Sequence, residues 1–485
     1  MRAGYELVAG LEVHCQLATR SKLFCPCPAE GFGEKANTRV CPVCTGQPGV
    51  LPVLNRRAVE LAFKAALALD CELAGVSIFA RKNYFYPDLP KAYQISQYEQ
   101  PFSSRGGLEI ALKDGSKKRV RIQRVHLEED AGKLLHAIGS EELEGSLVDF
   151  NRGGIPLIEI VSEPDLRSPE EAHAYLAALK EVLQYAEVSR CDMEKGEMRC
   201  DVNVSVRPAG SEKFGTRAEI KNVNSFKAVR DAMDYEFRRQ VEVLESGGRV
   251  VQETRLWDAE KKTTLPMRSK EEAHDYRYFP DPDLVPMAAD PAWVSELKAS
   301  LPELPAARRS RLASQYGLSA YESEVLAGDK DLADYFEAAA KGRSGASLKT
   351  LLNLMTTDLL GKLNAAGLPV SSSPVQAESL GGLVDLVERG TLSSKLAKEV
   401  LGRMWETGKG PEELVKELGL SQVTDEAQVK AWVEQALASN SGAAEDLRSG
   451  KEKAIGAIVG SVMKLSRGKA NPGLVNKLIK ELVGK

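Results

Sequence analysis

The sequence lacks long hydrophobic runs, and it contains few cysteines for its length. No segment approaches the roughly 18 consecutive apolar residues that span a bilayer, and the N-terminal stretch MRAGYELVAGLEVH has no signal-peptide core. We therefore expect a cytoplasmic protein. Eight cysteines among 485 residues are too few for a disulfide scaffold. With 43% apolar and 28% charged residues, the composition is that of a soluble globular protein, long enough for about three domains.

Common catalytic signatures are also missing. The sequence contains no GxxxxGK[ST] loop, no GxGxxG opening a helix and no protein-kinase set. It likewise lacks GxSxG and a serine-rich amidase signature, which excludes the usual acyl-hydrolysing nucleophiles. A nucleotide, if one binds, must be held without a standard phosphate loop.

Prolines divide the sequence into a mixed part and a helical part. Six prolines lie between residues 280 and 305, a density that neither a helix nor a central strand tolerates. A second break, ETGKGPEE, covers residues 406–413. We expect a multidomain α+β protein with a mixed-sheet domain over residues 1–290, an all-α domain over 291–407 and an all-α tail over 408–485.

Two helices in the first domain can be placed by their ends. Ser168, Pro169 and Glu171 form a capping-box pattern ahead of an apolar helical repeat. A second helix begins near Ser225 and stops at the glycine pair 247–248. Both predictions concern structure and carry no chemistry.

Polar side chains gather on one face of three predicted strands. In residues 7–17, Glu12 and His14 alternate with apolar residues and share a face. Residues 199–207 and 216–221 read as a hairpin. Its polar face carries Arg199, Asp201, Asn203, Ser205, Arg207, Arg217, Glu219 and Lys221. Asp, Asn and Ser are depleted in strands, so their presence on this face indicates a functional role.

The third strand changes phase between Ile122 and Val125, which predicts a bulge near Gln123–Arg124. The bulge brings together four polar residues, namely His126, Glu128, Glu129 and Asp130. Carboxylates and an imidazole on neighbouring strands suit Mg²⁺ with nucleotide phosphates. The alternative interpretation is a solvated, open sheet face.

Four cysteines are clustered with the spacing C-x-C-x13-C-x2-C, at Cys25, Cys27, Cys41 and Cys44. Two closely spaced pairs suit tetrahedral Zn²⁺, and four thiolates leave no open position for catalysis. We expect a structural zinc lobe, against the alternatives of a redox pair or plain buried thiols. Cys15, Cys71, Cys191 and Cys200 are scattered and are expected in the core.

Two further segments have features that are typical of nucleic-acid binding. Residues 83–102 hold six of the 29 aromatic residues, which either stack on bases or fill a loop-rich core. Residues 448–485 carry nine Lys/Arg and two Glu, which gives this segment a net charge of +7. The remaining residues therefore carry a net charge of −11, and the total of −4 conceals a basic tail. Such segregation favours contact with a polyanion over a merely solvated surface.

Several long motifs are similar to those of one family. They are GLEVHCQL (10–17), RKNYFYPDLPKAYQISQ (81–97), HLEEDAGK (126–133), PLIEIVSEPDLRSPEEA (156–172), RCDVNVSVRP (199–208), AEIKNVNSF (218–226), DYRYFPDPDLVP (275–286) and GKANPGLVNKL (468–478). Along essentially its full length the chain resembles GatB, the B subunit of the tRNA-dependent amidotransferase GatCAB.

The resemblance implies a ligase that forms a C–N bond with glutamine as amide donor. ATP phosphorylates the side-chain carboxylate of Glu-tRNA(Gln) or Asp-tRNA(Asn), and channelled ammonia displaces the phosphate to give Gln-tRNA or Asn-tRNA. The implied partners are GatA, which is the amidase of the complex, the small GatC that makes it a heterotrimer, the misacylated tRNA and a mischarging aminoacyl-tRNA synthetase, with no membrane. The implied fold is a kinase-like cradle, a helical domain and a YqeY-like tail.

The resemblance also implies site residues. Glu12, His14, Glu129 and Glu219 match Mg²⁺-binding catalytic positions, and Glu128 is included because strand alternation does not decide which neighbouring glutamate faces inward. The implied pocket for the nucleotide and the tRNA terminus comprises Tyr84, Tyr86, Lys91, Tyr93, Arg152, Ser162, Asp201, Asn203, Ser205, Lys221 and Asn224. The implied tRNA contacts of the tail are Lys451, Lys453, Lys464, Arg467 and Lys469.

A non-catalytic, zinc-containing RNA-binding protein is the competing class. It would explain the cysteines, the aromatic segment and the basic tail. It would not explain why Glu12 and His14 share a strand face near Asp201 and Glu219.

Overall fold

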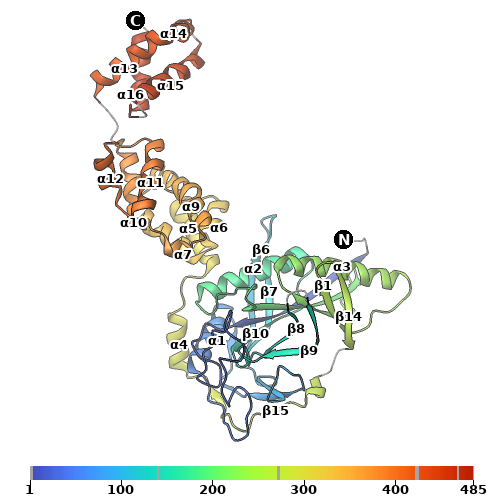
Figure 1. Ribbon diagram of the computed structural model, residues 1–485. Helices are drawn as coiled ribbons and strands as arrows, with labels where there is room; N and C mark the ends of the chain where they lie inside the picture. Colours follow the sequence, from blue (N-terminus) through green and yellow to red (C-terminus); the bar gives the residue numbers. More distant parts are fainter. Residues whose placement is uncertain are drawn as a thin grey trace. The chain divides into compact units, whose positions relative to one another are not determined.

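The computed structural model describes residues 4–138, 141–269, 273–420, 425–449, 451–466 and 469–483. The chain forms two compact units, Met1–Ala307 and Arg308–Lys485 (Figure 1). No helix within the described ranges is long and apolar enough to cross a membrane.

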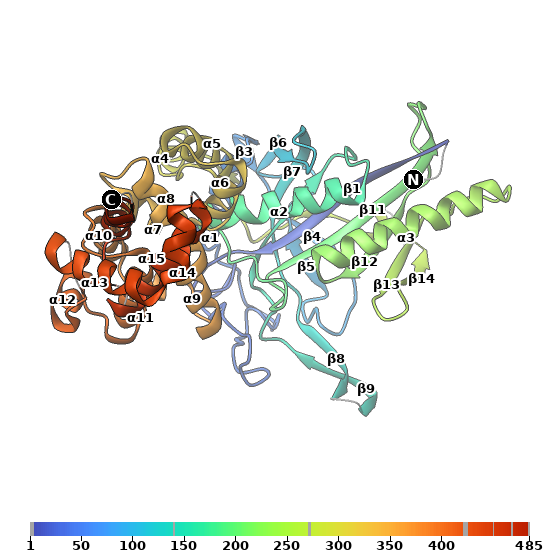
Figure 2. The same cartoon turned by 90° about the horizontal axis from the view of Figure 1, so that it is seen from above.

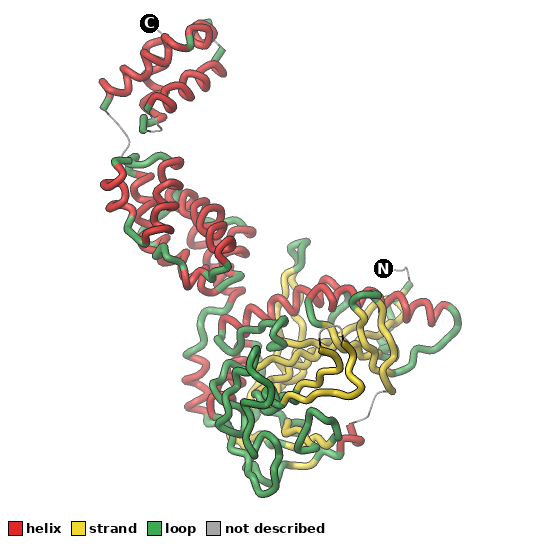
Figure 3. Tube along the Cα trace, in the orientation of Figure 1, coloured by secondary structure: helices red, strands yellow, loops and turns green. Residues whose placement is uncertain are grey.

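A nine-stranded sheet is the frame of the first unit, in the order β14-β13-β12-β11-β1-β10-β7-β6-β2 (Figures 1 and 3). Neighbouring strands are antiparallel except for the parallel pair β12 and β13. The strands are β1 (Tyr5–Gln16), β2 (Glu72–Leu73), β6 (Ser103–Ala111), β7 (Lys117–Glu129), β10 (Pro156–Ser162), β11 (Met198–Pro208), β12 (Ala218–Val223), β13 (Glu253–Asp258) and β14 (Thr263–Ser269).

One face of this sheet is apolar and is covered by helices α1 (Arg56–Ala68), α2 (Pro169–Tyr185) and α3 (Phe226–Glu245). Figure 2 shows α2 and α3 running along the same side of the sheet. Leu11 and Val13 of β1 are fully buried in this core together with Leu176 of α2 and Val229 of α3. Burial of alternate β1 residues leaves Glu12 and His14 on the opposite face.

Smaller elements complete the first unit. A three-stranded sheet contains β4 (Ala80–Asn83), β5 (Tyr93–Ser96) and β15 (Phe279–Pro280). The remaining elements are the pair β3 (Val76–Ser77) and β16 (Met287–Ala288), the hairpin β8 (Lys133–Ile138) and β9 (Glu141–Asp149), the short η1 (Ala273–Tyr276) and α4 (Pro291–Ala299).

The N-terminal capping residues predicted for α2 and α3 are confirmed, with one correction. Ser168 and Ser225 accept hydrogen bonds from the backbone N–H groups of Glu171 and Ala228, so both predicted helices begin where expected. The Glu171 carboxylate, however, accepts from the N–H of Arg167 and not from that of Ser168. The reciprocal half of the predicted capping box is therefore wrong, because Glu171 reaches one residue further back.

The proline-rich segment also contains a helix. Pro291 occupies the first turn of α4, where a missing N–H costs nothing, and Asp290 caps it. Leu297 of α4 is 5% exposed and belongs to the core of the first unit. The compact unit that contains α4 runs to Ala307.

The second unit is helical, and its described residues contain no strand (Figure 3). Its α-helices are α5 (Pro305–Tyr316), α6 (Ala320–Ala327), α7 (Lys330–Ala340), α8 (Ala346–Asn353), α9 (Leu360–Ala366), α10 (Ala377–Glu388), α11 (Ser394–Thr407), α12 (Pro411–Leu418), α13 (Glu426–Ser439), α14 (Ser441–Arg448), α15 (Ile455–Leu465) and α16 (Pro472–Val483). Shorter helical turns are η2 (Leu354–Leu359), η3 (Val370–Ser372) and η4 (Glu452–Ala454). One apolar cluster spans Leu312 to Val415 and another spans Val429 to Ile479.

Candidate functional site

The polar face of the large sheet forms the floor of a cavity of about 1310 Å³. The cavity is also lined by residues outside the large sheet, namely Lys82, Tyr84, Phe85, Tyr86, Asp88, Ser96, Gln97, Tyr98, Tyr276 and Tyr278. Eleven residues expected at the site line this cavity: Glu12, His14, Tyr84, Tyr86, Glu128, Ser162, Asp201, Asn203, Ser205, Glu219 and Lys221. Sequence positions far apart are therefore gathered in one concave, strongly polar place.

Two imidazoles, of His14 and His126, and two carboxylates, of Glu128 and Glu159, lie near one another in the middle of the floor. His14 of β1 lies opposite Glu159 of β10, and Glu159 lies opposite His126 of β7. The Nε2 atom of His14 lies 3.4 Å from Oε1 of Glu128 and 3.6 Å from Oε2 of Glu159. We name His14, Glu128 and Glu159 the first cluster, since one ligand atom from each lies within 4.8 Å of the others.

Burial and nearby charges have opposite effects on the pKa values of Glu159 in the first cluster and of His126 beside it. Burial alone would lower the pKa of His126, but Glu159 and Glu128 outweigh it and raise the pKa to about 9. Burial alone would raise the pKa of Glu159, but His126 and His14 hold that pKa well below its usual range. The carboxylates are therefore ionised, as metal ligands must be.

A second cluster lies on the neighbouring strands. Glu12 of β1 pairs in register with Asp201 of β11, and Asn203 pairs with Glu219 of β12. The side chains of Glu12, Asp201 and Glu219, here the second cluster, also bring one carboxylate oxygen each within 4.8 Å of the others. The Asn203 Nδ2 atom donates to Oε1 of Glu12 over 2.9 Å.

Both clusters have a donor chemistry that suits a hard divalent cation. One donor atom from each residue of a cluster lies within 4.8 Å of the others, and carboxylate oxygens, joined by one imidazole in the first cluster, are ligands that a divalent cation accepts. The donor sets therefore fit Mg²⁺.

Glu128 and Glu129 point to opposite sides of β7. Glu128 faces the cavity and His14, whereas the Glu129 carboxylate forms an ion pair with Lys91 and accepts from the N–H of Ile95. Glu129 belongs to neither cluster among the described residues. Lys91, Tyr93 and Glu129 line a separate cavity of about 100 Å³, beside Cys25 and Cys44. Glu129 is thus not placed to share a metal with Glu12, His14 and Glu219.

Two other expected pocket residues lie outside the large cavity. Arg152 donates to the carbonyl oxygens of Ala131 and Gly132. Asn224 is exposed, and its Nδ2 atom donates to Oδ1 of Asn222. Arg152 therefore stabilises local backbone, whereas Asn224 contacts a neighbouring side chain.

Buried Asp130 forms an ion pair with a guanidinium at the edge of the polar floor. Its carboxylate accepts hydrogen bonds from Arg199 and Gln16. Burial opposes ionisation of Asp130, but Arg199 and Arg152 hold its pKa below the usual range.

The aromatic segment divides between the cavity and the core. Tyr84 and Tyr86 line the cavity, whereas Phe102 is fully buried and stacks on Phe63. Tyr98 stacks on Tyr278 with ring centroids 4.2 Å apart and planes at 10°. The core interpretation is confirmed for Phe102, whereas base stacking by Tyr84 and Tyr86 stays a prediction.

Sequence reasoning missed several cavity residues. The most informative is Glu159, whose signal is a single charge in the otherwise apolar strand PLIEIVS. Others include Lys82, Arg124, Thr254, Tyr276 and Tyr278. The motif DYRYFPDPDLVP contains both of these tyrosines.

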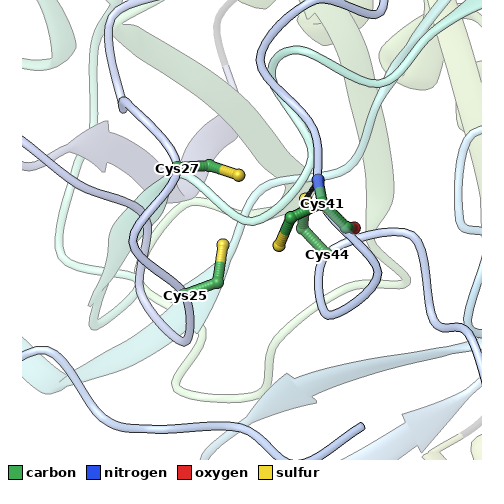
Figure 4. Close-up of side chains that lie close together, drawn as sticks. All are labelled: Cys25, Cys27, Cys41 and Cys44. Atoms are coloured by element: carbon green, nitrogen blue, oxygen red, sulfur yellow. Dashed lines mark hydrogen bonds between the residues drawn. The ribbon is translucent and has the colours of Figure 1, made fainter.

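The four clustered cysteines converge, as predicted. Figure 4 shows the side chains of Cys25, Cys27, Cys41 and Cys44 turned toward a common centre, and their sulfur atoms lie within 4.8 Å of one another. All four are free thiols. A hydrogen bond from Cys25, assisted by the fully buried ammonium of Lys22, lowers the pKa of Cys44. Four sulfur donors with one thiol readily ionised suit a closed tetrahedral zinc site. Cys15, Cys71, Cys191 and Cys200 are buried, as predicted.

The basic tail presents lysines on its surface. Lys451, Lys453 and Lys464 are exposed, and Lys469 is half-buried with its ammonium donating to the carbonyl of Gly419. Lys451 also pairs with Asp446 over 2.8 Å. Arg467 lies outside the described residues.

Comparison with known proteins identifies the family. Residues 7–295 match the GatB/GatE catalytic domain, and residues 334–483 match the GatB domain. The chain is 54% identical to the B subunit of the aspartyl/glutamyl-tRNA(Asn/Gln) amidotransferase of Carboxydothermus hydrogenoformans, with 99% of each chain covered. It has the same identity and coverage with the corresponding protein of Brevibacillus brevis, and 51% identity with that of Persephonella marina, again over 99% of both chains.

A match to a catalytic domain across most of the first unit decides against a non-catalytic RNA-binding protein. The chain belongs to the family of GatB subunits of tRNA-dependent amidotransferases, ligases that act as part of a complex.

Proposed function

We propose that the large cavity is the site where ATP phosphorylates the side-chain carboxylate of Glu-tRNA(Gln) or Asp-tRNA(Asn), before amidation to Gln-tRNA or Asn-tRNA. One observation carries the proposal. Two carboxylate clusters lie side by side on the floor of a single cavity, which is large enough for a nucleotide and the aminoacylated end of a tRNA. Membership of the amidotransferase family supplies the reaction class.

The reaction needs charge neutralisation more than covalent chemistry. A carboxylate oxygen of the aminoacyl group attacks the γ-phosphorus, the bond to the β,γ-bridging oxygen breaks, and ADP leaves with that electron pair. Ammonia then attacks the acyl phosphate carbon, inorganic phosphate leaves, and the nitrogen loses a proton to give the amide. Mg²⁺ would supply Lewis-acid charge neutralisation on the phosphate oxygens, held by His14, Glu128 and Glu159 and by Glu12, Asp201 and Glu219.

The chain's own residues position the reactants. Lys82 and Arg124 place cationic groups on the cavity lining, where phosphate oxygens carry negative charge. The stacked pair of Tyr98 and Tyr278 offers a flat aromatic surface for a base. Ser162 and Asn203 contribute neutral donors near the acidic groups, which suits polar contacts with ribose or phosphate.

Other parts of the chain serve the same reaction. The four-cysteine lobe holds structural zinc, and the tail beyond about residue 408 contacts tRNA through Lys451, Lys453, Lys464, Arg467 and Lys469. Ammonia comes from glutamine, which the amidase GatA hydrolyses, and the small GatC makes the complex a heterotrimer. The mischarging aminoacyl-tRNA synthetase is a further partner.

The decisive experiment follows ADP in the assembled complex when no glutamine or ammonia is supplied. ADP should form with ATP and Glu-tRNA(Gln) or Asp-tRNA(Asn), and it should not form with uncharged tRNA. Glu12→Gln and Glu128→Gln complexes should lose this activity and still bind tRNA. Amidation that proceeds without ATP, or undiminished ADP formation by both variants, would refute the assignment of this cavity.

A further inference from the structure

Lys22 is a fully buried lysine beside the four-cysteine lobe. Its Nζ atom lies 3.6 Å from Sγ of Cys44 and donates to the carbonyl oxygen of Phe150 over 3.3 Å. No carboxylate among the described residues forms an ion pair with Lys22, and Glu129, which lines the same cavity of about 100 Å³, pairs with Lys91 instead. Because a buried ammonium requires compensating negative charge, that charge has to come from the sulfur atoms.

We infer that Lys22 is the charge partner of the metal centre in this lobe, and that its ammonium tightens zinc binding by compensating the negative charge of the four thiolates. The inference rests on the proposed function, in which the lobe holds structural zinc. It deepens that proposal by naming a residue outside the ligand set on which zinc affinity depends. Lys22 acts through Cys44, so it is a positioning residue and not a ligand.

The net charge of the lobe depends on whether the metal is bound. Repulsion between such close sulfur atoms keeps the thiols of a metal-free lobe mostly protonated, and zinc binding releases their protons. Four thiolates around Zn²⁺ leave two net negative charges, in a lobe where Cys25, Cys27 and Cys44 are buried. An ammonium at 3.6 Å from one of these sulfur atoms offsets half of that charge. Lys22 therefore favours the zinc-bound lobe over the metal-free lobe.

Lys22 also connects the two cysteine pairs. Its backbone N–H donates to the carbonyl oxygen of Cys27 over 2.9 Å, which closes the turn that carries the first pair. Its side chain reaches the second pair, where Sγ of Cys44 also accepts from the backbone N–H of Cys41 over 3.2 Å. Substitution of the Lys22 side chain keeps the backbone contact with the first pair and removes only the charged donor to the second.

The alternative is a lysine with a purely structural role, which ties the lobe to the backbone at Phe150. A single hydrogen bond to a neutral carbonyl does not compensate a buried charge. A structural lysine would stabilise the chain to the same extent with and without metal. A charge partner of the metal centre stabilises the zinc-bound chain more, and this difference can be measured.

Metal titrations of the full-length chain, reduced and stripped of metal, test the inference. Co²⁺ bound to thiolates gives a sulfur-to-cobalt charge-transfer band, so this band reports the cysteine site while excess Mg²⁺ fills the carboxylate clusters. Lys22→Met keeps most of the side-chain length and removes the charge. It should bind zinc about ten-fold or more weakly in competition with a chelator, as expected when a group that supports a ligand is lost. Its cobalt band should move to longer wavelength, because sulfur gives up electron density more easily without a neighbouring cation.

Two further variants separate charge from other effects. Lys22→Gln keeps an N–H donor without the charge, and it should weaken zinc binding as Lys22→Met does. Lys64→Met is the matched control, because Lys64 lies on α1 and pairs with Glu60 over 3.7 Å, and its loss should change neither zinc affinity nor the cobalt band. The melting temperature of the metal-free chain should fall no further in Lys22→Met than in Lys64→Met, which shows that the variant is folded.

Equal zinc affinity of the unaltered chain and Lys22→Met would overturn the inference, as would full affinity in Lys22→Gln or an unmoved cobalt band. A melting temperature that falls equally with and without zinc would assign Lys22 the structural role instead. An unaltered chain that binds no zinc would refute the zinc assignment itself, and the inference with it. Zinc affinity is measured without ATP or tRNA, so failure of the proposed phosphorylation is recognised separately.

Discussion

The Nε2 atom of His126 lies 3.2 Å from Oε2 of Glu159, and the two residues are register partners on adjacent antiparallel strands. On its other side Glu159 is the register partner of His14. A single carboxylate thus stands between two imidazoles in a row across three strands. Because Glu159 is shared, its removal should affect both histidines at once.

Glu159→Gln should weaken Mn²⁺ binding at the first cluster by about ten-fold or more, since a ligand charge is lost while the shape is kept. Phosphorylation of misacylated tRNA, followed as ADP formation in the complex, should fall with it. Equilibrium Mn²⁺ titration provides the direct measurement. The control is Glu163→Gln, a cavity-lining glutamate outside both clusters, which should titrate as the unaltered chain does. Equal affinities for the two variants would remove Glu159 from the ligand set.

The pair Glu128 and Glu129 gives a contrast between adjacent residues. Glu128→Gln should impair Mn²⁺ binding, because its carboxylate contacts His14 and His126. Glu129→Gln should leave Mn²⁺ affinity unchanged, because its carboxylate pairs with Lys91 on the other side of β7. It should instead lower the melting temperature, since a nearly buried ammonium loses its partner, at a cost of about 3 kcal/mol. Mn²⁺ titration and calorimetry on both variants separate these effects. Loss of Mn²⁺ affinity in Glu129→Gln would contradict the orientation of β7.

From the four converging thiols of Cys25, Cys27, Cys41 and Cys44 we predict that each chain binds one zinc ion. Cys44→Ser should abolish zinc in the purified protein, measured by elemental analysis, because three thiolates and a hydroxyl no longer form a closed site. Cys71→Ser is the control, since Cys71 is a buried thiol away from the cluster. Zinc retained by Cys44→Ser, or a chain that purifies with no zinc while folded, would argue for plain thiols.

Replacing the exposed tail lysines Lys451, Lys453 and Lys464 with alanine should weaken tRNA binding. Each lost phosphate contact reduces the dependence of log K on log salt by about 0.7–0.9. Binding measured at several salt concentrations should therefore show a shallower slope for this variant. The matched control replaces Lys349, Lys395 and Lys398, which are exposed on α8 and α11, and an equal loss of slope there would mean that the effect is not specific to the tail.

The sequence alone predicted the polar face of β1, the β11–β12 hairpin and the bulge, because alternation is a local property. The bulge lies where Val161 and Ser162 pair with Arg124 and Ile122, leaving Gln123 as the extra residue. Whether Glu128 or Glu129 faces His14 depends on how that irregularity is resolved, which alternation does not decide. The role of Glu159 depends on the register between strands distant in sequence, and no local pattern encodes that register.

The ion pairs between α5 and α7 of the helical unit could not be predicted from the sequence, because no local pattern encodes contacts between distant residues. These ion pairs predict how the stability of the unit depends on pH. Glu337 of α7 accepts hydrogen bonds from Arg311 and Arg308 of α5, and these guanidinium groups hold its pKa below the usual range. A carboxyl with a lowered folded-state pKa contributes stability above its unfolded pKa of about 4.3, and that stability is lost as pH falls through the folded pKa.

Glu337→Gln should therefore destabilise the unit by about 1 kcal/mol near neutral pH, as expected for partly exposed pairs. The difference in melting temperature between the unaltered chain and Glu337→Gln should shrink as the pH falls from about 5 to about 3, because protonation removes the same charge that the substitution removes. Differential scanning calorimetry across this range measures it. Glu399→Gln, at an exposed position of α11, should show little difference at any pH. A Glu337→Gln difference that stays constant with pH would mean that packing, and not the charge of Glu337, joins α5 to α7.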